Sequence, residues 1–501
     1  MNQFFKKALR VILPVALLFT INAQAQVPVV KTDKGYIRGL SEGGITVFKG
    51  VPYAAPPIGA LRFKAPQPHA PWRDTLAATK FGSIATQAGG GSEDCLTLNV
   101  YTPKVDNSKR PVLVWVHGGS MTSGSGKGQN GHAFTDRDDI VTVTINYRLG
   151  IFGFTYLDDL GKQYAGSGNN GVLDCIMALR WVKQNIADFG GDPNRVTIMG
   201  ESAGAKLESA VLVSPSAKGL FSQYIAESGS VQCVRDINTA KGERDRVLAK
   251  LHLTKKEAAK LLTMPADSLM KAQAAATAGV TGLIFFGPVN DGVVIPQDPY
   301  KYAAAKKLPK IKALMGTNAN EFTLFMDRYP EMKAPDAAAV KALFADNAPM
   351  VYKTYLKEVK TLSPYDAADK TFTEYMYTIH NYRWAKAMVK AGIPTWEYRF
   401  DYIKNDALKA AHAREMPFIW FDPESKGMAD AEKRNLAMNM HKAWVAFIKT
   451  GNPNIPELPQ WPLYKTDTKP VMLFNINSSI TNLKKVFDDK AFPTTVMVFK
   501  R

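Results

Sequence analysis

The sequence has little cysteine, no internal repeat, no low-complexity stretch and no linker rich in proline and serine. These absences exclude a disulfide-rich scaffold, a repeat array and a string of domains joined by flexible segments. Of the 501 residues, 46% are hydrophobic and 22% are charged, so the chain can form a large core and disorder is not expected. We therefore expect residues 26–501 to form one large domain with insertions.

The three cysteines are Cys95, Cys175 and Cys233, and their spacing matches no metal-binding motif. They allow at most one internal disulfide and leave at least one thiol, and the sequence does not show which of them pair. Stability is expected to come mainly from core burial.

Long hydrophobic runs are absent after the N-terminus, so no later segment is expected to span a membrane. The first residues combine a basic start over 6–10, an apolar stretch over 11–21 and the small-residue signature Ala23-Gln24-Ala25. This pattern is typical of a secretory signal peptide, and the apolar stretch is well short of the roughly 20 residues that a membrane helix needs. We predict a signal peptide over residues 1–25, cleaved after Ala25, and a secreted or periplasmic protein.

The formal charge is +18, which is markedly basic for a chain of this length. The lysines are scattered and not interleaved with aromatic residues, so the sequence does not indicate nucleic-acid binding. A solvated basic surface is the main interpretation, and steering of anionic substrates or attraction to anionic surfaces is the alternative.

Strand and helix signals alternate through the central third of the chain. Strand patterns cover 96–101, 112–116, 141–145 and 196–199, and the clearest helical pattern covers 174–189. This order predicts an α/β fold with a large, mostly parallel central sheet that is flanked by helices. Two further helical stretches, around 240–278 and 334–391, are predicted to be cap insertions, with ordinary surface helices as the alternative.

The most informative motif is Gly200-Glu201-Ser202-Ala203-Gly204, which follows the last of these strand patterns. It is the Gly-x-Ser-x-Gly pattern of a nucleophile elbow, in which a tight turn from strand to helix presents the serine hydroxyl. The pattern alone is weak evidence, because glycine and serine often meet in ordinary turns. A serine also needs a base and donors for the oxyanion.

Several other segments resemble the signatures of the type-B carboxylesterase and cholinesterase-like family of α/β-hydrolases, and together they span nearly the whole mature chain. They are Phe48-Lys49-Gly50-Val51-Pro52-Tyr53-Ala54 with Leu61-Arg62-Phe63, Glu93-Asp94-Cys95-Leu96-Thr97-Leu98-Asn99-Val100-Tyr101-Thr102-Pro103, Asn146-Tyr147-Arg148-Leu149-Gly150, Phe189-Gly190-Gly191-Asp192-Pro193 and Thr450-Gly451-Asn452-Pro453-Asn454. The resemblance implies the α/β-hydrolase fold and an esterase that needs no metal or cofactor.

The resemblance also implies a catalytic triad. Ser202 corresponds to the nucleophile, Glu321 in Gly316-Thr317-Asn318-Ala319-Asn320-Glu321 to the acid, and His412 in His412-Ala413-Arg414-Glu415 to the general base. This chain order of serine, acid and histidine is the one found on α/β-hydrolase sheets. Taken singly, each residue has a plainer interpretation as a solvated or hydrogen-bonded side chain.

The resemblance assigns the oxyanion hole to the backbone amides of Gly118, Gly119 and Ala203. Gly118 and Gly119 directly follow the strand pattern 112–116, and glycine lets the bare backbone approach a substrate closely. We interpret His117 as structural, because it lies outside the serine, acid, histidine order.

Other positions resemble supporting residues of the family, and some depart from its pattern. The resemblance implies an ion pair between Arg62 and Glu93, and it implies that Ser228 lies near the acid. Glu201 is expected near the triad. The departures are Ala205-Lys206-Leu207, where the family usually has Gly-Ala-Ser, Ala413, where the family usually has glycine after the histidine, and Ala85, where we expect the cysteine that pairs with Cys95. That disulfide is therefore expected to be absent.

From these observations we expect a secreted serine carboxylesterase that acts on a small-molecule ester through an acyl-enzyme on Ser202. One alternative is a hydrolase specialised for aromatic or polyol esters, carbamates or lactones. Another is a catalytically silent relative used for binding or adhesion. The sequence does not indicate the oligomeric state.

Overall fold

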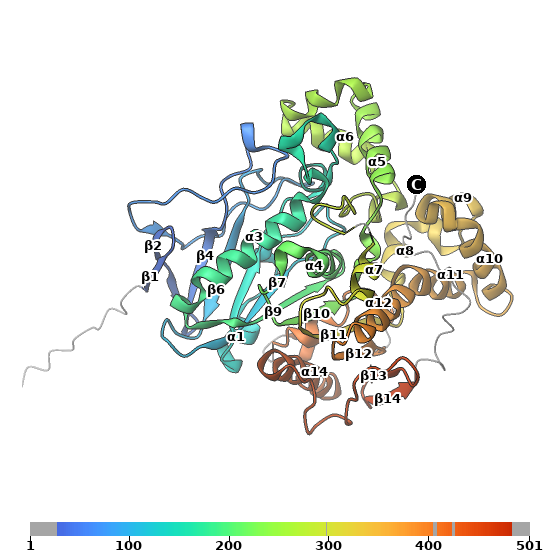
Figure 1. Ribbon diagram of the computed structural model, residues 1–501. Coiled ribbons are helices and arrows are strands. Elements are labelled where there is room, and N and C mark those ends of the chain that lie inside the picture. Colours follow the sequence, from blue (N-terminus) through green and yellow to red (C-terminus); the bar gives the residue numbers. More distant parts are fainter. Residues whose placement is uncertain (1–27, 297, 404–407, 423–425, 483–501) are drawn as a thin grey trace, which may run out of the picture.

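The computed structural model describes residues 28–296, 298–403, 408–422 and 426–482 (Figure 1). The predicted signal peptide, residues 1–25, lies outside the described residues. In the described part of the chain, no helix has the length and apolar character that crossing a membrane requires.

The centre of the molecule is a large mixed β-sheet (Figure 1). Its strands are β3 (Leu40–Glu42), β4 (Ile45–Pro52), β6 (Thr97–Thr102), β7 (Arg110–Val116), β8 (Val141–Ile145), β9 (Gly191–Glu201), β10 (Gln223–Glu227), β11 (Lys312–Asn318), β12 (Thr395–Phe400), β13 (Pro470–Phe474) and β14 (Ser479–Asn482). Within the described residues their spatial order is β14-β13-β12-β11-β10-β9-β7-β8-β6-β4-β3. A small separate sheet contains β1 (Val29–Thr32), β2 (Gly35–Arg38) and β5 (Leu76–Ala77).

The strands from β13 to β8 in this order run parallel to their neighbours, and the antiparallel pairs lie at the two edges of the sheet. The predicted mostly parallel α/β sheet is therefore confirmed. The carboxyl ends of parallel strands meet at one edge of such a sheet, so residues that follow β7, β9 and β11 are brought together there.

Helices cover both faces of the sheet, and further helices lie beyond it at one end and one side of the molecule (Figure 1). They are α1 (His132–Asp138), α2 (Gly150–Phe154), α3 (Asn170–Asn185), α4 (Ala203–Val213), α5 (Ile237–Lys250), α6 (Ala266–Ala276), α7 (Pro299–Ala304), α8 (Thr323–Arg328), α9 (Ala337–Phe344), α10 (Ala348–Glu358), α11 (Pro364–Thr373), α12 (Ile379–Lys390), α13 (Met416–Ile419) and α14 (Ala431–Thr450). Figure 1 shows α3 and α4 over one face of the sheet, with α5 and α6 at one end of the molecule and α9, α10 and α11 at its side.

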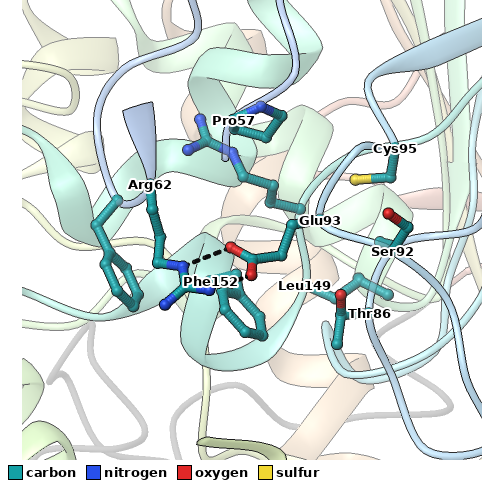
Figure 2. A pocket seen from close by; sticks show the side chains of 11 residues that line it. Pro57, Arg62, Thr86, Ser92, Glu93, Cys95, Leu149 and Phe152 are labelled. Atoms are coloured by element: carbon teal, nitrogen blue, oxygen red, sulfur yellow. Dashed lines mark hydrogen bonds and ion pairs between the residues drawn. The ribbon is translucent and has the colours of Figure 1, made fainter. Parts of the chain in front are cut away.

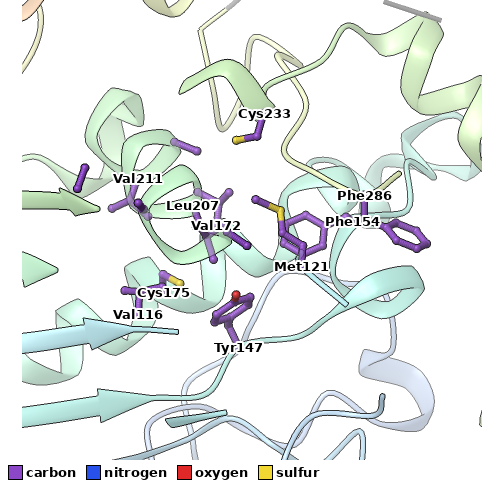
Figure 3. Close-up of a cluster of buried hydrophobic side chains, with 14 of the residues drawn as sticks. Val116, Met121, Tyr147, Phe154, Val172, Cys175, Leu207, Val211, Cys233 and Phe286 are labelled. Carbon is purple, nitrogen blue, oxygen red and sulfur yellow. The ribbon is translucent and has the colours of Figure 1, made fainter. Parts of the chain in front are cut away.

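Alternation along β7 divides the core into two layers, because successive side chains of a strand point to opposite faces. Val112, Val114 and Val116 belong to the buried cluster that includes α3 and α4, and Figure 3 shows Val116 in this cluster with Leu207 and Val211 of α4. The intervening residues Leu113 and Trp115 belong to a second cluster, which contains α14. Both faces of β7 are buried, which explains its continuous apolar run.

The helix predicted over 174–189 lies four residues earlier than expected. α3 begins at Asn170 and ends at Asn185, and a 3₁₀ turn, η6 (Ile186–Phe189), follows it. Asn170 and Gly171 are poor helix formers, but both are buried, and the Asn170 side chain donates a hydrogen bond to the carbonyl oxygen of Phe63. Tertiary contacts therefore override the local preference at this end.

The two stretches that were expected to be helical do contain helices. The first includes α5, the 3₁₀ segment η9 (Lys255–Leu262) and α6, and the second includes α9, α10, α11 and α12. A π-helical turn, η13 (Glu374–Thr378), joins α11 to α12.

Candidate active site

Ser202 lies in a sharp turn between the end of β9 and the start of α4. Its backbone has φ 55° and ψ −118°, a conformation that residues other than glycine rarely adopt. The turn can pack against β7 only because a glycine follows Ser202 closely. A Cβ atom at Gly204 would lie 2.0 Å from the carbonyl oxygen of Val116. The predicted nucleophile elbow is therefore present, and Ser202 sits at the strained point of the turn.

Glu321 and His412, which are 91 residues apart in the sequence, lie side by side. Glu321 follows β11, and its Oε2 atom accepts a hydrogen bond of 2.6 Å from Nδ1 of His412. The other carboxylate oxygen accepts hydrogen bonds from the Ser228 hydroxyl at 2.6 Å and from the backbone amide of Asn318 at 2.7 Å. Both oxygens of this fully buried acid are thus bonded, which holds the carboxylate in a single orientation. Ser228 lies near the acid, as the resemblance implies.

The other ring nitrogen of His412 faces Glu201. The His412 Nε2 atom lies 3.1 Å from Oε1 of Glu201, the residue that precedes Ser202. Within the described residues, no hydrogen bond joins this nitrogen to the Ser202 hydroxyl. His412 and Ser202 nevertheless line the same cavity, so the structure brings all three predicted triad residues to one site.

Burial and charge act in opposite directions on the imidazole of His412. Burial alone would lower its pKa, but the carboxylates of Glu201 and Glu321 raise it above the ordinary value. Burial raises the pKa of Glu201, an effect that the charge of His412 partly offsets. A base with a raised pKa binds a proton more readily, and it is neutral only at a higher pH than an ordinary histidine.

The predicted oxyanion glycines lie directly against Ser202. A Cβ atom at Gly118 would lie 3.2 Å from Cβ of Ser202 and 2.9 Å from the backbone oxygen of Glu201, so only glycine fits there. Gly119 has φ 110°, a conformation open to glycine, and its carbonyl oxygen accepts bonds from the amides of Thr122 and Ser123. Within the described residues, the amides of Gly118, Gly119 and Ala203 donate no hydrogen bond. They are therefore available to a ligand.

A wide cavity opens above these groups. Its volume is about 1270 Å³. It is lined by Ser202, Glu201, Gly119 and His412, by α6 residues such as Met270, and by Phe325 of α8. A site of this size could hold a drug-sized ligand, with the serine and the imidazole at its wall.

Comparisons with known proteins agree with this geometry. A sequence model described as the Carboxylesterase family matches residues 26–490. The chain belongs to this family. It is 34% identical to the para-nitrobenzyl esterase of Bacillus subtilis (strain 168) over 485 residues, which cover 91% of this chain and 96% of that protein. It is 32% identical to carboxylesterase 1D of Rattus norvegicus, with coverage of 87% and 88%.

Solved carboxylesterases share the fold. The carboxylesterase EST55 of Geobacillus stearothermophilus superposes with a TM-score of 0.84 at 34% identity, covering 92% of this chain and 99% of that one. A PNB esterase structure superposes with a TM-score of 0.83 at 33% identity, covering 93% and 99%. This carboxylesterase therefore has the α/β-hydrolase fold, and it is a carboxylic ester hydrolase.

His117 of this carboxylesterase is buried and does not line the cavity. Its ring stacks on Tyr147 at a centroid distance of 4.4 Å, and Nδ1 donates a hydrogen bond of 2.8 Å to the carbonyl oxygen of Gly118. Burial lowers the pKa of His117 to about 4, so it is neutral near pH 7. The structural role proposed for His117 agrees with this position.

The ion pair between Arg62 and Glu93 is present, and the two side chains face each other in Figure 2. Arg62 Nε donates a hydrogen bond of 2.7 Å to Glu93, and Nη1 donates one of 2.6 Å to the carbonyl oxygen of Met264. The pair thus connects the N-terminal region to the segment that leads into α6, a wall of the cavity. Cys95 lies nearby (Figure 2) and is unpaired, as are Cys175 and Cys233, so the family disulfide at Cys95 is absent as expected.

Three residues make contacts in this site that the sequence motifs did not predict. The Gln87 side chain bonds both backbone groups of Gly124, each at 2.9 Å, and so clamps the loop that carries Gly118 and Gly119. The ring of Tyr377 packs against His412 at 4.9 Å, and the ring of Phe325 packs against it at 5.2 Å. Each contact joins segments far apart in the chain, so no local pattern could have predicted it.

Proposed function

We propose that this carboxylesterase uses Ser202, His412 and Glu321 as its catalytic triad. The observation that supports this most strongly is the hydrogen bond of 2.6 Å between His412 and Glu321, beside a serine in a strained elbow. The carboxylate fixes the imidazole tautomer, with the proton on Nδ1 and the lone pair on Nε2. In the structure Nε2 faces Glu201, and the proposed mechanism requires that this nitrogen instead accept the proton of the Ser202 hydroxyl.

In the proposed first step, Ser202 Oγ bonds to the carbonyl carbon of the ester, and its proton moves to Nε2 of His412. The proton then passes to the leaving alcohol as the bond between the carbonyl carbon and the alcohol oxygen breaks. Water attacks the acyl-enzyme in the second step, again giving its proton to His412, and the acid leaves with Ser202 restored. The negative charge of Glu321 stabilises the imidazolium in both steps.

The amides of Gly118, Gly119 and Ala203 are proposed to bind the oxyanion of each tetrahedral intermediate. They carry no other hydrogen bond within the described residues, so they need no rearrangement before the reaction. Loss of one such donor typically costs about 10²- to 10³-fold in turnover.

We also propose that residues 1–25 are a signal peptide, that the mature chain is secreted or periplasmic, and that residues 26–501 form one domain with the two helical insertions. The sequence pattern supports the signal peptide, because a basic start, a short apolar stretch and Ala23-Gln24-Ala25 follow one another there.

Turnover of a chromogenic short-chain ester by purified variants tests the triad. Ser202→Ala and His412→Ala are expected to lose at least about 10³-fold in kcat with an unchanged thermal midpoint, and Glu321→Gln is expected to be severely impaired. Lys353→Met, on an exposed face of α10, is the control and is expected to match the native enzyme. Near-normal turnover in His412→Ala would reject the assignment of the base.

A further inference from the structure

Gln273 is a buried polar residue on α6, the helix that forms one wall of the cavity. The residue is only 5% exposed, and it lines the cavity that holds Ser202 and His412. A buried amide side chain normally has hydrogen-bond partners for both its oxygen and its nitrogen. The other buried positions of this helix are apolar: Leu269, Ala272 and Ala276.

The oxygen of the Gln273 side chain is held by the protein. Its Oε1 atom accepts a hydrogen bond of 2.8 Å from the backbone amide of Ile151, in the first turn of α2. Because a backbone N–H can only donate, this bond identifies the oxygen and so places the nitrogen on the other side of the group. Gly150 makes the close approach possible, since a Cβ atom there would lie 2.1 Å from Oε1.

The nitrogen of the same side chain has no partner in the protein. Among the described residues, none accepts a hydrogen bond from Nε2 of Gln273. This atom is also not one of the polar atoms that the described chain encloses completely without a partner, so it is accessible. The accessible space that Gln273 lines is the cavity. Its two N–H groups therefore have a fixed direction and are available to a ligand.

A second free donor is the hydroxyl of Ser120. This residue directly follows Gly119, one of the proposed oxyanion donors, and it lines the same cavity. The hydroxyls of Thr122 and Ser123 donate to the carbonyl oxygen of Gly119, but in the part of the chain that the structure describes the Ser120 hydroxyl has no partner. Ser120 has φ 53°, a conformation that is costly for a residue with a side chain and that often marks functional sites.

The two free donors belong to segments that contact each other. The carbonyl oxygen of Met121, the residue after Ser120, accepts a hydrogen bond of 2.7 Å from the backbone amide of Gly150. Gly150 is also the residue against which the Gln273 amide packs. Ser120 and Gln273 therefore line neighbouring parts of the cavity wall, beside the proposed oxyanion hole.

We infer that Ser120 and Gln273 form a subsite for an uncharged oxygen acceptor of the substrate, such as a keto or ether oxygen beyond the scissile ester. The inference rests on the proposed function of Ser202. Both groups donate hydrogen bonds and neither carries a charge, so a carboxylate would lose its water without gaining a counter-charge from either residue. An ester without the acceptor leaves the donors unpaired, which weakens its transition-state binding relative to a matched ester.

Two pairs of matched esters test the subsite. Ethyl 4-oxopentanoate is compared with ethyl 4-methylpentanoate, and 2-methoxyethyl acetate is compared with butyl acetate, with release of acid measured for all four. The first pair places the acceptor on the acyl group, and the second places it on the alcohol. In at least one pair, we expect the native enzyme to favour the ester with the acceptor by about threefold to tenfold in kcat/KM, the range expected for one neutral hydrogen bond.

Gln273→Glu separates the two roles of the amide. A glutamate oxygen can still accept the hydrogen bond from Ile151, but the atom that faces the cavity becomes an acceptor. We expect this variant to bring the ratio of kcat/KM within the favoured pair to about one or below. Ser120→Ala removes only the hydroxyl and is expected to lower the ratio by about twofold or more. Lys271→Met, an exposed position of α6 that lines the same cavity, is the control and is expected to leave the ratio within about twofold.

The ratio also distinguishes recognition from a purely structural role. If Gln273 only joined α6 to α2, its replacement would lower the thermal midpoint or reduce kcat/KM equally for both esters of a pair. No preference in the native enzyme, or a preference that survives in Ser120→Ala and in a folded Gln273→Glu, would overturn the inference while leaving the esterase function intact. An equal fall of the ratio in Lys271→Met would overturn the assignment to these two donors. If the native enzyme hydrolyses none of the four esters, the proposed function fails and this inference fails with it.

Discussion

The His412 imidazole lies between two carboxylates, with Nδ1 2.6 Å from Glu321 and Nε2 3.1 Å from Glu201. The first contact orients the ring for catalysis. The second places a carboxylate beside the nitrogen that exchanges a proton with Ser202 in the proposed mechanism. Both charges favour the protonated ring, so they raise the pKa of His412.

This relationship determines the expected pH dependence. His412 accepts a proton only when it is neutral, so kcat/KM falls as the pH drops through the pKa of the imidazole in the free enzyme. Because that pKa is raised, the decline begins at a higher pH than it would with an ordinary histidine. Glu201→Gln removes one of the charges that raise the pKa of His412, so it should move the acid limb to lower pH. A profile of kcat/KM against pH for both enzymes measures this, and an unchanged or upward shift would contradict it.

Ala413 carries a strain that glycine would relieve. Its φ is 63°, in the left-handed region, where a Cβ atom is sterically unfavourable. The family usually has glycine after the histidine. We expect Ala413→Gly to raise the free energy of unfolding by about 1 kcal/mol, as measured by urea denaturation. Ala446→Gly, inside α14 and more than one turn before its end, is the control and should lower the free energy of unfolding by about 1 kcal/mol. A destabilised Ala413→Gly variant would show that this strain is not the dominant effect.

Glycine should also relieve the backbone strain at Ser202 in the elbow. Ser202→Ala and Ser202→Gly both remove the proposed nucleophile, but only glycine adopts φ 55° and ψ −118° without a clash involving Cβ. We expect the glycine variant to be more stable than the alanine variant by about 1 kcal/mol, with both inactive. Thermal and urea unfolding of the pair provide the measurement. Equal stability would indicate that the turn relaxes when the hydroxyl is lost.

Gln87 is expected to act as a positioning residue for the oxyanion loop. Its side chain pairs with both backbone groups of Gly124, and the loop from Gly118 to Gly124 carries two of the three proposed donors, the amides of Gly118 and Gly119. Gln87→Leu should lower kcat by roughly tenfold or more with a smaller change in KM, because misplaced donors weaken transition-state binding. Gln67→Leu, at an exposed position, is the matched control. Equal losses in kcat/KM for both variants, or a change confined to KM, would contradict this role.

The sequence motifs predicted those parts of the fold and site that depend on local pattern. The alternation of strands and helices and the elbow at Ser202 follow from neighbouring residues, whereas Glu321 and His412 were assigned through the resemblance to the family. The predicted start of α3 was wrong, because the burial of Asn170 and Gly171 outweighs their low helix propensity. Glu201 was expected near the triad, but its contact with Nε2 of His412 depends on how two distant segments pack.

The same limit applies to Lys206, which the sequence marks only as a departure from the family pattern. Its orientation toward Tyr377 depends on the π-helical turn 171 residues later in the chain, and no local preference predicts such a turn. The strain at Ala413 likewise becomes visible only from its backbone angle. In each case the missing information is a long-range contact or a dihedral angle.

Covalent labelling tests the central claim most directly. The purified enzyme is treated with an organophosphate, digested, and examined by mass spectrometry, with Ser202→Ala and His412→Ala treated in parallel. We expect one adduct on the Ser202 hydroxyl in the native enzyme, no adduct at this position in Ser202→Ala, and greatly slowed labelling in His412→Ala. An inhibited native enzyme that carries its adduct on another residue, or full-rate labelling of Ser202 without His412, would contradict the proposed triad.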